Sequence, residues 1–129
     1  MERFHEKTWR GSFDVEGAMS ARSMGSGEVS GLSTPSLVAM VEQACWKLVV
    51  PGLGDGETTV GTEIKLTHER PSAVGNKIEV EATLVSAEGR MLRFEVVAKD
   101  NGNEIAHAEH ARVIVNKDKF ESKISQTSH

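Results

Sequence analysis

The alternation of apolar and polar residues in the second half of the chain is what most restricts its fold. Between residues 58 and 116 this alternation has a period of two and forms four runs. In the first run, TTVGTEIKLTH, one face would carry Val60, Thr62, Ile64, Leu66 and His68. A period of two is typical of strands with one buried and one solvated face. Glu88-Gly89 and Asn101-Gly102 suit tight turns between the runs. Residues 58–116 therefore predict an antiparallel sheet whose last three strands form a meander.

A segment with a helical period precedes this sheet. In the stretch that begins LSTPSLVAMVEQAC, apolar side chains recur at about 100° per residue, as in an amphipathic helix. Ser33 or Thr34 suits the N-cap, and Pro35 suits the first helical position. We expect a central helix over residues 33–50 that covers the apolar face of the sheet. Glu42 stands at the border of its apolar stripe, so the question is which residue it faces.

The two ends of the chain are less regular. Residues 1–32 predict a short strand in GSFDVEG followed by a loop, MSARSMGSGEVSG, that has the composition of a mobile lid. Residues 117–129 predict a polar tail that frays, with Phe120 as the residue that docks. We therefore expect residues 1–129 to form a single α+β domain, one long helix wrapped by a curved antiparallel β-sheet.

Composition excludes several classes of protein. Fifteen Lys and Arg against nineteen Asp and Glu give a net charge of −4, which argues against nucleic acid as a partner. No apolar run approaches the roughly 20 residues of a membrane span, so we expect no membrane partner and a cytoplasmic location. The single cysteine, Cys45, lies in the helical stripe and is expected to be a buried, inert thiol. His107 and His110 are three apart on a strand and point to opposite faces, so no metal site is predicted.

His68 is the best candidate to face Glu42. It continues an apolar row to the end of a predicted strand, on the side that faces the helix. An imidazole near a border carboxylate is a common arrangement for a general base, although a half-buried structural histidine fits the same spacing. Thr34 stands at the positive end of the helix, where an oxyanion is stabilised, although a plain helix cap fits there too.

These residues carry a resemblance to a known family. Thr34 with Glu42 eight residues on, TTVGTEIKLTH ending in His68, and VSAEGRMLRFEVVAKDNGNEIAHAEHARVIV resemble the fluoroacetyl-CoA thioesterase type of the hotdog-fold thioesterase superfamily. The resemblance covers roughly residues 30–120. It implies a catalytic Thr34, Glu42 and His68, with Gly61 lining the acyl pocket and Arg112 near the thioester end of the site. It also implies a homodimer.

The resemblance implies hydrolysis of a small acyl-CoA thioester, with coenzyme A as part of the substrate and no separate cofactor. His68, oriented by Glu42, would take a proton from the attacking group, and amides at the helix N-terminus would hold the oxyanion. Whether Thr34 attacks the carbonyl or positions a water stays open, as does whether Arg112 holds substrate charge or fixes Glu42. The lid differs from the fluoroacetyl-specific pattern because residues 24–29 contain no aromatic side chain.

Two other functions fit the same fold. One is a non-catalytic acyl-CoA-binding domain, and the other is a hotdog hydratase or dehydratase. A hydratase relies on a histidine and an acidic residue within one short motif, and no such motif surrounds His68.

Overall fold

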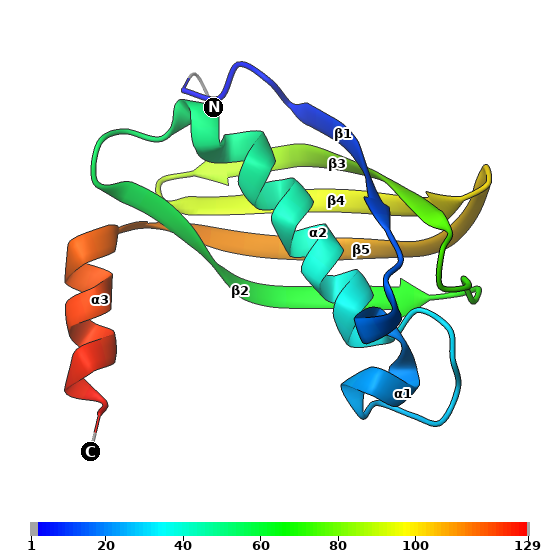
Figure 1. Ribbon diagram of the computed structural model, residues 1–129. Helices are drawn as coiled ribbons and strands as arrows, with labels where there is room; N and C mark the ends of the chain where they lie inside the picture. Colours follow the sequence, from blue (N-terminus) through cyan, green and yellow to red (C-terminus); the bar gives the residue numbers. More distant parts are fainter. Residues whose placement is uncertain (1–2, 129) are drawn as a thin grey trace.

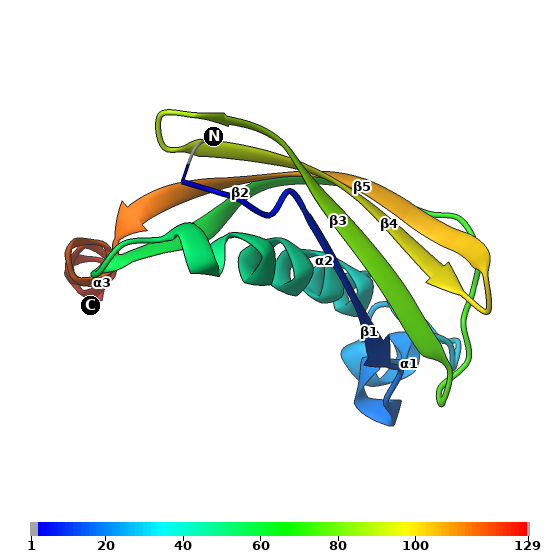
Figure 2. The same ribbon diagram turned by 90° about the horizontal axis from the view of Figure 1, so that it is seen from above.

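The computed structural model describes residues 3–128 and contains one curved antiparallel sheet with a long helix on its concave side (Figures 1 and 2). The strands are β1 (Thr8–Asp14), β2 (Glu57–His68), β3 (Lys77–Glu88), β4 (Met91–Asp100) and β5 (Asn103–Asn116). They lie in the order β1-β3-β4-β5-β2, with every neighbouring pair antiparallel. The predicted helix wrapped by a curved antiparallel sheet is confirmed.

Tight turns join the meander β3-β4-β5 at the predicted places. Gly89 has a φ of 60°, and Asn101 and Gly102 have φ values of 51° and 81°. Glycine and asparagine tolerate this left-handed region better than other residues, which explains why these dipeptides close the hairpins.

The central helix α2 (Thr34–Val49) differs from its prediction at the N-terminus. Ser33 is the N-cap and its hydroxyl accepts the Ser36 amide at 3.1 Å, so Thr34 is the first helical residue and Pro35 the second. The hydroxyl of Thr34 is therefore not used as the helix cap. The face toward the sheet buries Leu37, Met40, Val41, Ala44, Cys45, Leu48 and Val49.

A β-bulge in β2 changes which residues face the helix. Gly61 pairs with Arg112 and Glu63 with Ala111, so Thr62 is the extra residue. Ile64, Leu66 and His68 face the helix as predicted, whereas Val60 and Thr62 do not continue their row. Thr59 and Gly61 take those places because the extra residue shifts the alternation by one.

The N-terminal segment is more ordered than the predicted lid. After β1 come a short 3-10 helix, η1 (Gly17–Met19), and α1 (Ala21–Met24), and a bridge between Ser20 and Leu32 closes the loop. The Arg22 amide also binds the Val29 carbonyl at 3.0 Å. Side chains 22–30 are nevertheless all exposed.

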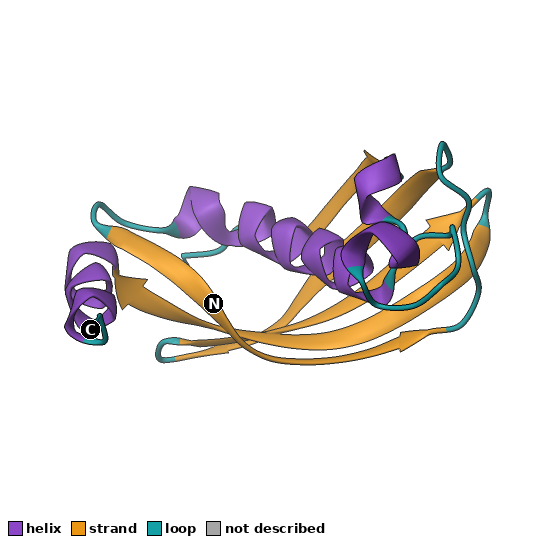
Figure 3. Cartoon of the chain, turned by 60° about the horizontal axis from the view of Figure 1, so that its bottom comes forward, coloured by secondary structure: helices purple, strands orange, loops and turns teal. Residues whose placement is uncertain are grey.

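The predicted frayed tail is wrong for residues 117–126, which form helix α3 (Lys117–Gln126). Asn116 caps this helix by accepting the Lys119 amide at 2.9 Å, and Asp118 lies in its first turn, where a negative charge is favourable. Phe120 is half-buried. The helix follows β5 beside the start of β2 and lies apart from α2 (Figures 1 and 3).

No helix formed by residues 3–128 is long and apolar enough to cross a membrane.

Candidate active site

The structure brings Thr34 and His68 together. Thr34 stands in the first turn of α2, and His68 is the last residue of β2. Thr34 Oγ1 lies 3.0 Å from His68 Nδ1, which is a hydrogen bond in which the hydroxyl can donate to the imidazole. The other ring nitrogen, His68 Nε2, is enclosed and has no hydrogen-bond partner among residues 3–128. A hydroxyl that donates to an imidazole nitrogen has the geometry that general-base activation of a hydroxyl requires.

Fewer helix amides are available for an oxyanion than the sequence predicts. Pro35 has no N–H, and the amides of Ser36 and Leu37 bind the hydroxyl and the carbonyl of Ser33. Of the first four residues of α2, this leaves only Thr34 with an amide that is neither missing nor used by Ser33. The structure therefore offers one helix amide, and not several, for the predicted oxyanion site.

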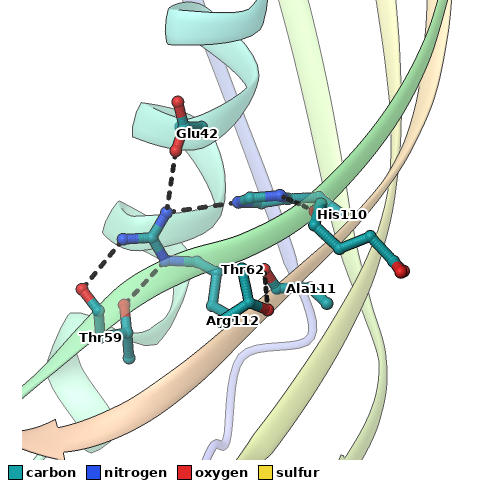
Figure 4. Close-up of polar contacts among 7 residues, drawn as sticks. Glu42, Thr59, Thr62, His110, Ala111 and Arg112 are labelled. Atoms are coloured by element: carbon teal, nitrogen blue, oxygen red, sulfur yellow. Dashed lines mark hydrogen bonds and ion pairs between the residues drawn. The ribbon is translucent and has the colours of Figure 1, made fainter.

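Glu42 and Arg112 meet at a second position, where the middle of α2 faces β5 beside the edge strand β2 (Figure 4). Glu42 Oε2 lies 3.9 Å from Arg112 Nη1. The guanidinium of Arg112 also donates from Nε to Thr59 Oγ1 at 2.8 Å and from Nη2 to the Thr59 carbonyl at 3.0 Å. The Arg112 side chain is only 8% exposed, while that of Glu42 is 45% exposed. Between the two roles predicted for Arg112, these contacts favour fixing Glu42.

His110 completes this cluster from the neighbouring position on β5. Its Nε2 lies 3.3 Å from Arg112 Nη1, and its Nδ1 lies 2.8 Å from the carbonyl of Glu63. Burial, together with the charge of Arg112, lowers the pKa of His110. Burial also lowers the pKa of Arg112, but a guanidinium is not deprotonated in proteins, so Arg112 stays charged. A neutral His110 therefore donates from Nδ1 and accepts from Arg112 at Nε2.

Gly61 faces the same cluster because of the bulge at Thr62. Gly61 and His68 are seven residues apart, an odd number that would place them on opposite faces of a regular strand. A Cβ atom on Gly61 would lie 2.7 Å from Glu42 Oε2 and 3.2 Å from His110 Cε1. The absent side chain therefore leaves the space in which the Glu42 carboxylate lies.

Cys45 is buried beside this cluster. Burial raises the pKa of its thiol to about 12, so the thiol stays protonated and unreactive near neutral pH. The prediction that Cys45 is buried is confirmed, and its raised pKa agrees with the prediction that it is inert.

The two groups of candidate residues are well separated within one subunit. Thr34 and Glu42 are eight residues apart on α2, which corresponds to about 12 Å along the helix axis. Gly61, which adjoins Glu42, is about 20 Å along β2 from His68. The prediction that Glu42 orients His68 is therefore not met within a single subunit.

A third group lies on the outer face of the sheet. His107 Nδ1 contacts Glu69 Oε1 at 2.8 Å and Glu104 Oε2 at 3.3 Å. All three residues are exposed, and hydrogen bonding to Glu69 is the main cause of the raised pKa of His107. His107 and His110 do point to opposite faces, as predicted. The absence of a metal stays a prediction.

Thr59 and His110 were not predicted as site residues. A signal for His110 was present, because His110 and Arg112 are two apart on a strand and must share a face. Thr59 could not be identified, because its inward position depends on the bulge.

Comparison with known proteins identifies the family. The model of the fluoroacetyl-CoA-specific thioesterases matches residues 15–118. The chain belongs to this family. It is 36% identical to the fluoroacetyl-CoA thioesterase of Streptantibioticus cattleyicolor over 94 residues, which are 73% of this chain and 68% of the relative.

Solved structures agree with this assignment. A phenylalanine-to-alanine variant of a fluoroacetyl-CoA-specific thioesterase, in complex with fluoroacetate and CoA, superimposes with a TM-score of 0.89 at 29% identity, over 94% of this chain and 99% of that one. A hot-dog-like protein from Thermanaerovibrio acidaminovorans has a TM-score of 0.88 at 18% identity over 99% and 96% of the two chains. The predicted hotdog fold and the predicted thioesterase family are both confirmed.

Proposed function

We propose that this enzyme hydrolyses the thioester of a short acyl-CoA, with Thr34 and His68 at the reacting carbonyl. The observation that carries the proposal is the 3.0 Å contact between Thr34 Oγ1 and His68 Nδ1 at the N-terminus of α2. Membership in the thioesterase family supports the reaction type, and a relative that binds fluoroacetate and CoA supports the substrate class. CoA is part of this substrate, and the reaction as proposed needs no separate cofactor or metal.

In the first step, His68 Nδ1 takes a proton and so activates the attacking oxygen. That oxygen belongs either to Thr34 or to a water held by Thr34. A C–O bond forms at the carbonyl, the C–S bond breaks, and the CoA thiolate leaves with the proton returned by His68. If Thr34 is the nucleophile, a water then cleaves the acyl-threonine ester. Mass spectrometry of the enzyme during turnover distinguishes these routes by the presence or absence of an acyl adduct.

The enzyme acts as a homodimer in which the site is shared. β2 is the last strand in the sheet order, so its outer edge has no strand partner within residues 3–128. A free edge along a strand of 12 residues favours pairing with another strand, and Ile64 and Leu66 on the inner face of β2 are only partly buried. A two-fold axis through Lys65 would pair β2 with its copy and place Ile64 opposite Leu66, so that the bulge at Gly61 and Thr62 comes opposite His68 of the partner subunit.

This arrangement supplies the partner that each half of the site lacks. Glu42 lies beside Gly61, so in the dimer its half-exposed carboxylate comes near His68 of the partner subunit. The enclosed Nε2 of His68 has no hydrogen-bond partner among the described residues of its own subunit. A carboxylate that accepts from Nε2–H would hold the imidazole with Nδ1 toward Thr34.

Release of free thiol from a panel of acyl-CoAs tests the proposal. Thiol release from acetyl-, propionyl- or butyryl-CoA supports a hydrolase. Binding without release would support a non-catalytic acyl-CoA-binding domain, and a change in enoyl absorbance would support a hydratase. We further propose a cytoplasmic location, which is consistent with the unpaired thiol of Cys45.

A further inference from the structure

The contacts of His110 define which of its ring nitrogens carries the proton. Its side chain is buried, at 3% exposure, and its ring stacks on Phe94 with centroids 6.0 Å apart. Nδ1 lies 2.8 Å from the backbone carbonyl of Glu63, and a carbonyl can only accept. The proton must therefore be on Nδ1, and because the Arg112 guanidinium that faces Nε2 can only donate, Nε2 accepts with its lone pair.

Arg112 needs such an acceptor because it is buried and charged. Thr59 accepts from Nε and Nη2, which leaves Nη1 between His110 Nε2 at 3.3 Å and Glu42 Oε2 at 3.9 Å. A guanidinium held on three sides has one orientation, and this orientation directs Nη1 to the carboxylate of Glu42.

We propose that His110 is a positioning residue, whose neutral Nε2 fixes the guanidinium of Arg112 and through it the carboxylate of Glu42. The inference rests on the proposed thioesterase function, to which it adds a residue that does not touch the substrate. Protonation of His110 would replace the lone pair by a second N–H and place a cation against Arg112. The charged groups that act on His110 are Arg112 on its own strand and Glu42 on α2.

Two conservative substitutions separate the two hydrogen bonds of His110. In His110→Gln, the amide oxygen can replace Nε2 as the acceptor for Arg112. In His110→Asn, the amide nitrogen can replace Nδ1 as the donor to Glu63, and the acceptor for Arg112 is lost. His107→Gln is the matched control, since His107 lies three residues away on the same strand and is exposed on the other face.

We expect kcat of His110→Asn to fall about 10-fold or more, the scale of losing one hydrogen bond to a charged group, with KM within about 3-fold. His110→Gln should keep kcat within about 3-fold of the wild type, as should His107→Gln. A residue that only filled space would not distinguish Asn from Gln in kcat, and its effects would follow the melting temperature. Equal kcat for wild type and a folded His110→Asn would overturn the proposal.

Nitrogen NMR of the wild-type imidazoles gives a test that needs no folded variant at position 110. We expect His110 to be neutral at pH 7, with the proton on Nδ1 and a bare Nε2. A protonated Nε2 at pH 7 would refute the proposal. A failure of the proposed function can be told apart from this result. If the wild type released no thiol from any acyl-CoA, the thioesterase proposal would fail, while the protonation of His110 seen by NMR would be unaffected.

Discussion

Replacing Gly61 by alanine should damage catalysis and leave the fold intact. The new Cβ would lie 2.7 Å from Glu42 Oε2, whereas ordinary contacts begin at 3.4 Å, so the carboxylate must move by about 0.7 Å (3.4 − 2.7). Glu42 Oε2 is the far end of a flexible side chain, and His110 Cε1 at 3.2 Å has to give by only a few tenths of an ångström, so both adjustments are made by side chains. Displacements of about 1 Å in a catalytic constellation cost up to about 10²-fold in rate, and we expect a loss of about 10- to 100-fold in kcat/KM.

The same substitution should change stability little. Alanine in place of glycine stabilises a protein by about 0.4–1 kcal/mol through the unfolded chain where the conformation allows it. A loosened contact between the half-exposed Glu42 and Arg112 costs about 0–1 kcal/mol. The two effects nearly cancel, and the melting temperature should stay within about 4 °C of the wild type.

Comparison of acetyl-, propionyl- and butyryl-CoA separates two explanations for Gly61. If alanine displaces Glu42, the loss of kcat/KM is the same for all three substrates. If Gly61 instead gives room to the acyl chain, the loss grows with acyl length. Gly17→Ala is the control, since a Cβ there meets nothing within 4 Å. Wild-type kcat/KM for a folded Gly61→Ala would refute the assignment of Gly61 and Glu42 to the site.

Three further outcomes are expected. Thr34→Ala should reduce thioester hydrolysis by about 10² or more with little change in melting temperature. Ser33→Ala should instead cost about 1 kcal/mol of stability, because it removes the N-cap of α2. If calorimetry showed that Thr34→Ala loses this stability while its activity was kept, Thr34 would be the cap. The lid has no aromatic side chain, so kcat/KM for fluoroacetyl-CoA should exceed that for acetyl-CoA by less than about 10³-fold, and a larger ratio would contradict this. Because the pKa of His110 is lowered in the folded state, the unfolded chain takes up a proton first as pH falls below about 6.5, and stability is lost down to the folded-state pKa. His110→Gln should remove this part of the acid sensitivity of the melting temperature. An unchanged pH dependence in that variant would argue against it.

The sequence was sufficient for most of the fold, because its two hydrophobic periods differ clearly and its turns carry Glu88-Gly89 and Asn101-Gly102. It was insufficient at the bulge, since an extra residue at Thr62 leaves no mark in composition. A strict two-residue alternation along β2 therefore predicts Val60 on the inner face, whereas Thr59 and Gly61 lie there in the structure. It was also insufficient at residues 117–126, where one capping asparagine and a half-buried phenylalanine stabilise a helix of low apolar content.

The site was predicted in its parts but not in its grouping. Thr34 and His68 come together because a helix N-terminus and a strand end meet at one end of the sheet. Glu42 joins Arg112 and not His68, since eight residues of helix separate it from Thr34. A pattern within one chain could not reveal a contact that we propose to form between two chains.

Mixing two inactive variants tests the shared site most directly. Glu42→Gln and His68→Ala are each expected to lose hydrolysis by about 10² or more. In a mixed dimer, Glu42 of one subunit and His68 of the other would be intact at one of the two sites. If subunits exchange freely, half of the dimers are mixed, and thiol release should recover to about one quarter of the wild-type rate. Sedimentation must show that each variant is a dimer and that subunits exchange. No recovery in an exchanged mixture would contradict the shared site, as would a stable wild-type monomer that hydrolyses acyl-CoA.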